Sequence, residues 1–205
     1  MLKFKCREII ANLNFYKLCS EIKLTESECS VIIREVLAAL VFFSKKNVNH
    51  LAVSSTSVVI IDNRVTLVDF RFVKHPELYR SDSVSFRFAF LAPEIQKREE
   101  ANYKADIWGL GVVLYELCTG KYPYEHFDPL KMLFHMQTRP DLVSLLGDEY
   151  SNDVKDFIGK CVLANASARA TYEELLVHPF ITTWQHLDTT ETLRNVIAKY
   201  QNAEQ

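Results

Sequence analysis

The sequence predicts a mainly α-helical domain that carries one small β-hairpin. Thr25 and Glu28 have the spacing of a capping box, and apolar residues follow at helical intervals, which predicts a helix over about 26–46. Two short β-branched runs within residues 58–67 enclose Asp62-Asn63-Arg64, a plausible hairpin turn. Long helical segments around one hairpin favour a helical domain over a sandwich or barrel.

Further helices are predicted along the rest of the chain. An apolar segment over about 101–118 stops at Gly120, as expected for a buried helix that ends on a glycine. Gly109-Leu110-Gly111 lies inside this helix, so we expect it to serve packing and not phosphate binding. Shorter helices are predicted near 129–136 and 152–162, and two more begin at the capping-box pairs Thr171/Glu174 and Asp188/Glu191.

Composition restricts the classes of partner and compartment. The 205 residues are 48% hydrophobic and 24% charged, with a net charge of -2, which argues against nucleic acid or a membrane surface as the main partner. The five cysteines are scattered without a Cys-x-x-Cys pair, which favours a reducing compartment, the cytoplasm or nucleus. The longest apolar runs fall short of the roughly 20 residues that span a bilayer.

Three ordered segments carry a family resemblance. They are Ala92-Pro93-Glu94, then 104–124 with Asp106-Ile107-Trp108-Gly109, and finally 169–180, which ends in His178-Pro179-Phe180. In this order and spacing they resemble the C-terminal lobe of protein kinases, and in detail the sterile-twenty group. The resemblance implies a kinase-like C-lobe over 25–183. It makes 1–24 a vestigial hinge and first-helix region, and 184–205 a C-terminal helix.

The resemblance also implies structural roles for individual residues. Glu94 is expected to form a buried ion pair with Arg169, and Asp106 to accept hydrogen bonds from the backbone of the catalytic loop. Trp108 is expected to pack beneath Ala92-Pro93-Glu94. The alternative for each is a surface charge or an ordinary core aromatic.

The segment that corresponds to the catalytic loop lacks its chemistry. Residues 50–57, His50-Leu51-Ala52-Val53-Ser54-Ser55-Thr56-Ser57, align without a gap with the kinase pattern H-R-D-L-x-x-x-N. Ala52 then stands where kinases have the Asp that accepts the substrate proton. Ser57 replaces the Asn that holds magnesium, and Ser54 replaces a Lys that steadies the phosphate. His50 survives, at a position of structural support, and we expect no catalytic residue here.

Nucleotide binding is expected to be weak or absent. Asp69 is the surviving metal-ligand position, yet one carboxylate is a poor magnesium site, so pairing with Arg71 or capping of a turn is favoured. Phe70 is assigned a packing role. No glycine precedes Asp69, and 24 residues precede Thr25, which predicts that the upper lobe with its glycine-rich loop is absent or vestigial. No cofactor is therefore expected, although weak ATP binding stays open.

Two regions are candidates for binding a partner. Phe86, Arg87, Phe88 and Phe90 lead into Ala92-Pro93-Glu94, where a kinase holds its peptide; Phe88 and Phe90 filling the core is an equal alternative. Leu2 and Phe4 belong to an apolar start of the chain that would cover the face under a missing upper lobe, unless a partner or a second copy covers it. The serines at 81, 83 and 85 are interpreted as solvated loop residues.

These observations lead to one functional hypothesis and two rivals. The hypothesis is a catalytically inactive kinase-like protein that works as an adaptor or allosteric regulator of an active kinase or scaffold, similar in kind to STRAD-type pseudokinases. The first rival is a weak or unconventional Ser/Thr protein kinase that binds ATP. The second is a truncated copy with no specific activity. Partner and oligomeric state are left open.

Overall fold

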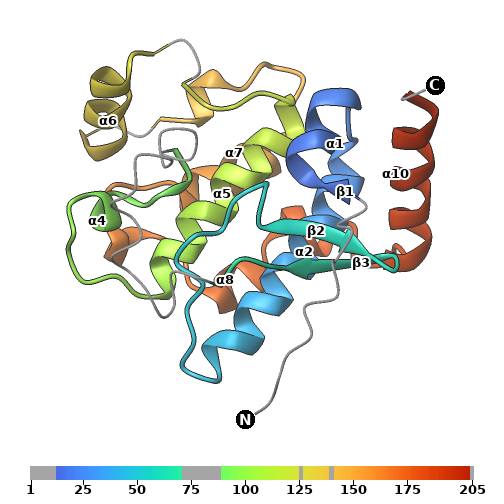
Figure 1. Ribbon diagram of the computed structural model, residues 1–205, viewed down its shortest axis with the longest axis horizontal. Coiled ribbons are helices and arrows are strands. Elements are labelled where there is room, and N and C mark those ends of the chain that lie inside the picture. The colour runs from blue at the N-terminus through green and yellow to red at the C-terminus, as the bar shows by residue number, and fades with distance from the viewer. Residues whose placement is uncertain (1–12, 71–88, 125–126, 139–140, 204–205) are drawn as a thin grey trace.

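The computed structural model describes residues 13–70, 89–124, 127–138 and 141–203. The architecture is mainly helical with one small antiparallel sheet, as predicted (Figure 1). None of the described helices is long and apolar enough to cross a membrane. The helices are α1 (Phe15–Glu21), α2 (Glu26–Ser44), α4 (Pro93–Gln96), α5 (Tyr103–Thr119), α6 (Pro129–Thr138), α7 (Asn152–Cys161), α8 (Tyr172–Leu176), α9 (Pro179–Thr182) and α10 (Thr189–Ala203), with 3-10 turns η3 (Val143–Leu145) and η4 (Ala166–Ala168).

The sheet contains one strand more than the predicted hairpin. Strands β2 (Val58–Ile61) and β3 (Arg64–Leu67) pair antiparallel across the turn at Asp62-Asn63, where both residues have positive φ. The additional strand is β1 (Leu13–Asn14), which pairs antiparallel with β2. The sheet order is therefore β1-β2-β3.

Local end signals define the long helices. At Thr25 both halves of the capping box are present, because the Thr25 hydroxyl accepts from the Glu28 N–H and the Glu28 carboxylate accepts from the Thr25 N–H. Helix α5 begins two residues later than predicted, since Asn102 caps it by accepting from the Lys104 N–H. It ends at Gly120, whose φ of 69° is the left-handed conformation that glycine tolerates.

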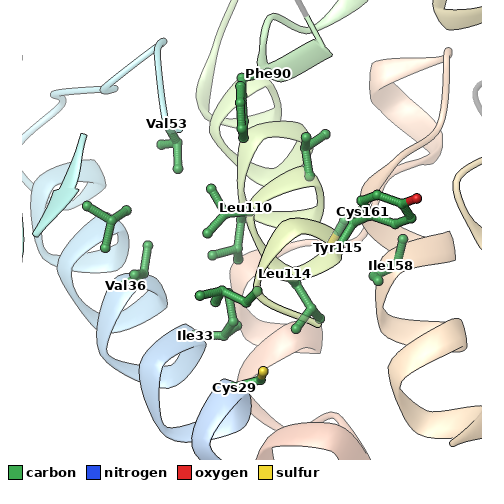
Figure 2. Packing of buried hydrophobic residues seen from close by; sticks show 14 of the residues in the cluster. Cys29, Ile33, Val36, Val53, Phe90, Leu110, Leu114, Tyr115, Ile158 and Cys161 are labelled. Atoms are coloured by element: carbon green, nitrogen blue, oxygen red, sulfur yellow. The ribbon is translucent and has the colours of Figure 1, made fainter. Parts of the chain in front are cut away.

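The core forms where α5 packs between α2 and α7 (Figures 1 and 2). Cys29, Ile33 and Val36 of α2 face Leu110 and Leu114 of α5, and all are buried. The glycines of α5 allow this close packing. A Cβ at Gly111 would lie 2.5 Å from the Cβ of Cys161, and one at Gly109 would lie 2.6 Å from the carbonyl oxygen of Val53. The glycine pair thus serves packing, as expected.

The C-terminal helix α10 lies along α2 and the hairpin (Figure 1). Leu193, Val196 and Tyr200 are buried against them. Polar contacts fix the start of the helix, because Arg34 of α2 donates to the Thr189 hydroxyl over 2.9 Å and to the Leu187 carbonyl over 3.2 Å. Helix α10 is therefore an integral layer of the domain.

Candidate functional site

Residues 50–57 form a loop that connects α2 to β2 and rests on the start of α5. The Asp106 carboxylate fixes the beginning of this loop. It accepts from the His50 N–H over 2.8 Å and from the Leu51 N–H over 2.5 Å, which are the hydrogen bonds expected for it. Burial raises the pKa of Asp106 to about 7, although the two N–H groups favour the ionised form. Leu51 has a φ of 63°, so the loop bends sharply just before position 52.

His50 braces the loop against the end of the hairpin. Its Nδ1 accepts from the Ala52 N–H over 3.3 Å, so Nε2 carries the proton and donates to the Val68 carbonyl over 2.9 Å. Burial lowers the pKa of His50, and the Val68 bond and the charge of Asp69 oppose that shift. Both ring nitrogens are therefore used by the backbone of the protein itself.

The positions that would carry catalysis hold a methyl group and inward-turned hydroxyls. Ala52 is 7% exposed and offers no proton acceptor in its side chain. The Ser57 hydroxyl accepts from the Ser54 N–H over 2.8 Å and has the carbonyls of Ala52 and Ser54 within 3.2 and 3.0 Å. The Ser54 hydroxyl lies 3.1 Å from the Thr56 hydroxyl. These serines complete the hydrogen bonding of their own loop.

Asp69 and Phe70 follow β3 and face His50. Asp69 is half-buried with a φ of 70°, and the Phe70 ring lies 4.6 Å from the His50 ring and 4.7 Å from that of Phe43. Phe70 thus makes the packing contacts assigned to it. The pairing of Asp69 with Arg71 stays a prediction, because Arg71 lies outside the described residues. Within the described part of the chain, no group of three or more His, Cys, Asp or Glu residues could hold a metal ion.

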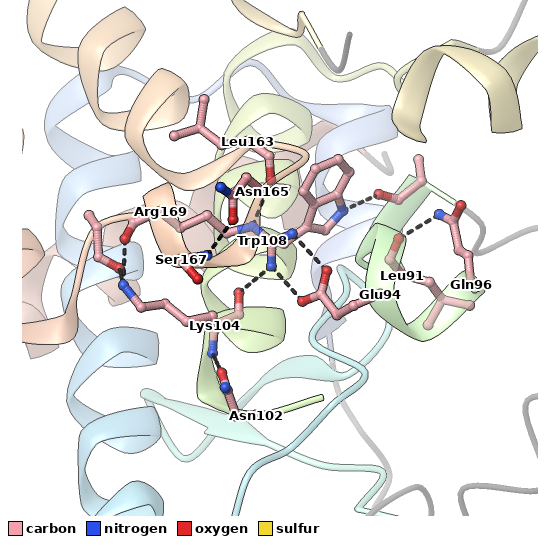
Figure 3. A network of polar contacts seen from close by, with 12 residues as sticks. Leu91, Glu94, Gln96, Asn102, Lys104, Trp108, Leu163, Asn165, Ser167 and Arg169 are labelled. Carbon is pink, nitrogen blue, oxygen red and sulfur yellow. Dashed lines mark hydrogen bonds and ion pairs between the residues drawn. The ribbon is translucent and has the colours of Figure 1, made fainter. Parts of the chain in front are cut away.

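A second cluster of polar contacts joins the segment 89–96 to α5 and to Arg169, which precedes α8 (Figure 3). Arg169 and Glu94 form a bidentate ion pair with N–O distances of 2.6 and 2.8 Å, and both residues are buried. Arg169 also donates to the carbonyls of Lys104 and Leu163. The Trp108 N–H donates to the Ala89 carbonyl over 2.9 Å, and its ring lies 5.1 Å from the Arg169 guanidinium. These residues occupy the positions that the resemblance implied.

Of the candidate binding residues, Phe90 lies in the part of the chain that the structure describes, and its position agrees with the core alternative. Phe90 is 5% exposed and packs in the core, with its ring 5.9 Å from that of Tyr122. An aromatic side chain at this depth stabilises the domain and is inaccessible to another protein. The other candidates lie outside the described residues and stay predictions: Phe86, Arg87, Phe88, Leu2 and Phe4.

Glu116 is a buried carboxyl group next to this loop that was not among the predicted site residues. Glu116 is 3% exposed in the last turn of α5, and the Ser55 side chain hydrogen-bonds to it. Burial raises its pKa to about 7, and the Ser55 bond opposes the shift. Among the described residues, its Oε2 atom has no hydrogen-bond partner. An acidic residue inside the otherwise apolar run 107–118 was the available signal.

Glu116 gives a testable pH dependence of stability. Its folded pKa of about 7 exceeds the ordinary value of 4.5, so the stability that this residue contributes is fully present below pH 4.5 and is lost as pH rises through about 7. That shift corresponds to about 3 kcal/mol. We expect Glu116→Gln to gain stability relative to the wild type by up to about 3 kcal/mol between pH 5 and pH 8.

Urea denaturation at each pH measures this difference. The exposed Glu99→Gln replacement serves as a control for the loss of one carboxyl group at the surface. Parallel profiles for Glu116→Gln and the wild type would contradict the assignment.

Comparison with known sequences identifies the class of protein that this fold and this loop define. The chain matches the protein kinase domain family over residues 6–181 and therefore belongs to that family. It is 33% identical over 180 residues to the serine/threonine-protein kinase ppk11 of Schizosaccharomyces pombe, covering 86% of this chain and 56% of that protein. It is 32% identical over 162 residues to the serine/threonine-protein kinase STE20 of Eremothecium gossypii, covering 77% of this chain and 17% of that protein.

A third relative is a plant enzyme. The chain is 31% identical over 180 residues to mitogen-activated protein kinase kinase kinase 1 of Arabidopsis thaliana, which covers 85% of this chain and 29% of that protein. The chain spans about half the length of the first relative and less than a third of the other two. The resemblance to protein kinases is thereby confirmed, with a STE20 kinase among the relatives.

Proposed function

We propose that this chain is a catalytically inactive member of the protein kinase family, a pseudokinase that acts by binding another protein. Its role is that of an adaptor, scaffold or allosteric regulator of an active kinase or signalling partner. The net charge of -2 favours a protein partner over nucleic acid or a membrane surface. The scattered cysteines favour the cytoplasm or nucleus as its location.

The observation that carries this proposal is the methyl group of Ala52 at the position of the proton acceptor. Loss of a general base costs typically 10²–10⁴-fold in rate. The nearby carboxyl of Asp106 is no substitute, because each of its oxygens accepts from a backbone N–H of the same loop. Ser57 stands where kinases have the Asn that binds magnesium, and its hydroxyl forms hydrogen bonds within the loop. Asp69 is then left without this second magnesium ligand.

The supporting structure of the family is retained where the chemistry is lost. Asp106 holds the loop, Arg169 and Glu94 form their ion pair, and Phe70 packs on His50. A domain that keeps these structural contacts but has lost its catalytic side chains can still present a stable surface to a partner protein. This combination favours the adaptor over a truncated copy without activity.

A weak ATP-dependent Ser/Thr kinase is the second candidate, and Asp69 favours it. This carboxylate remains at the position of a metal ligand, and the three relatives reported above are named as kinases. Nucleotide phosphates can supply the other ligands of a magnesium ion. Asp69 therefore provides the decisive variant.

Phosphate transfer from labelled Mg·ATP to a generic protein substrate separates the two candidates. We expect the wild-type chain and Asp69→Ala to give the same background signal, and Mg·ATP to leave the melting temperature unchanged. Transfer by the wild type that Asp69→Ala abolishes would establish the enzyme and refute the proposal. The adaptor role further requires that the tagged chain co-purifies with a defined protein in a near-equal molar amount.

A further inference from the structure

An open apolar cavity lies between the end of α6, the η3 turn and the C-terminal half of α7. Its volume is about 370 Å³, within the range of ligand and anchor pockets. Its floor is buried, with Leu142, Ile158 and Val162 almost inaccessible, whereas Thr138 and Asp141 at its rim are exposed. It is lined by Thr138, Asp141, Leu142, Val143, Ile158, Gly159, Val162, Leu163 and Ala164.

Gly159 opens one wall of this cavity, although packing does not require a glycine there. It lies in the interior of α7, where glycine is less stable than alanine. An added Cβ would have its nearest heavy atom, Val143 Cγ2, at 3.5 Å, an ordinary contact distance. Gly109 and Gly111 differ, because a Cβ at either would collide with a neighbour. Glycine at position 159 thus lowers the stability of the helix without being required by packing, and the absence of a side chain there leaves space in the cavity.

The surface next to the cavity is apolar along α6. Leu130 and Phe134 are 79% and 66% exposed, and Thr138 at the cavity rim is four residues further along the helix. Residues four apart share one face of a helix, so these three form a continuous strip that leads to the cavity. Exposed apolar strips of this kind mark interaction surfaces in soluble proteins.

The charge at the rim of the cavity indicates which further group a ligand of this cavity would carry. Asp141, Leu142 and Val143 form one wall of the cavity, and the exposed Asp141 carries its carboxylate at the rim. Asp141 is the ionisable side chain among the described residues that line the cavity. A basic group in the ligand would complement this rim.

We infer that the cavity holds a bulky apolar side chain of a partner protein, adjacent to a basic residue of that partner. The open rim and the strip along α6 fit a polypeptide that continues past its anchor. Anchors of this kind are typically aromatic side chains in pockets, surrounded by weaker contacts. The inference concerns a surface apart from residues 50–57 and does not depend on the loss of catalysis.

The test uses a defined peptide, acetyl-Gly-Ser-Trp-Arg-Ser-Gly-amide, titrated into the whole chain. We expect selective NMR shifts of the Gly159 amide with a Kd on the order of 1 mM, typical of a single anchor. Replacing Trp by Ala in the peptide should weaken binding about tenfold, and replacing Arg by Glu should weaken it about threefold.

Matched variants at one position give the control. Gly159→Ala should keep binding and raise the melting temperature by about 2–4 °C, whereas Gly159→Leu should fill the cavity and abolish binding. Asp141→Asn keeps the capping acceptor for the Ser144 N–H and should weaken binding of the Arg peptide alone. This exposed variant decides the question if Gly159→Leu fails to fold.

Four outcomes would overturn the inference. They are an unperturbed Gly159 amide, binding that is indifferent to Trp or Arg, free indole that binds as tightly as the peptide, and a concentration-dependent dimer that Gly159→Leu dissociates. The third would assign the cavity to small molecules and the fourth to a second copy of this chain. None of them changes the phosphate-transfer result, so failure here is distinguishable from failure of the proposed function.

Discussion

Replacing Arg169 with alanine should lower the free energy of unfolding by about 3–5 kcal/mol, among the largest losses for any single change in this chain. Arg169 is 2% exposed, and its two terminal nitrogens bind both oxygens of Glu94. Removal of the guanidinium would leave the Glu94 carboxylate buried with no opposite charge. It would also leave the carbonyls of Lys104 and Leu163 without this donor.

Urea denaturation measures the loss, and an exposed ion pair in the same domain provides the control. Lys155 and Asp148 are 3.9 Å apart, with the Asp148 side chain fully exposed, so Lys155→Ala should cost less than about 1 kcal/mol. The double variant Glu94→Leu/Arg169→Met should be more stable than Arg169→Met alone, because no unpaired charge remains. A loss for Arg169→Ala no larger than that of Lys155→Ala would show that the pair is not a fixed part of the fold.

The helices were predictable because their signals are local. The capping boxes at Thr25 and Thr171 form in the structure with the partners that the sequence indicated. Asp188 accepts from the Glu191 N–H over 2.7 Å, which likewise follows from a spacing of three residues. Gly120 ends α5 because it alone tolerates a positive φ without a Cβ penalty.

The third strand could not be predicted from its own residues. Leu13 and Asn14 pair with Ile60 and Val59, and a strand of two residues has no alternation to detect. The family resemblance implied a first helix somewhere within 1–24, but its bounds at Phe15–Glu21 were not predicted, since these seven residues lie next to a strand that depends on contacts far along the chain. Asn14, which caps α1 by accepting from the Lys17 N–H, was the one local signal.

The loss of the catalytic side chains could be predicted from the sequence, whereas the contacts made by the residues that replace them could not. Ala52 follows from alignment of eight residues with the kinase pattern, whereas the closed hydroxyl network of Ser54, Thr56 and Ser57 depends on the loop geometry. The contact of Ser55 with Glu116 joins positions on different elements, which no local pattern reports. The spacing of residues in the sequence thus shows which catalytic side chains are replaced. The hydrogen bonds that the replacing hydroxyl groups form within the loop depend on its three-dimensional structure.

Asp106→Ala is the second change with a large expected effect, because it removes the support of the loop that carries Ala52. The His50 and Leu51 N–H groups would lose their acceptor in a buried place. An unsatisfied buried donor costs about 1–3 kcal/mol, so the two together should cost about 2–6 kcal/mol. Asp106→Asn keeps one acceptor oxygen in the same shape and should cost roughly half as much.

The pH dependence distinguishes this mechanism from simple loss of packing. The folded pKa of Asp106, about 7, lies above the ordinary value of 3.8, so the stability that it contributes is fully present below pH 3.8 and is lost as pH rises through about 7. The penalty of Asp106→Ala should therefore be larger at pH 5 than at pH 8. Hydrogen exchange should show faster exchange at the His50 and Leu51 amides. Unchanged exchange there, with a penalty independent of pH, would mean that α5 does not hold the loop through this carboxyl group.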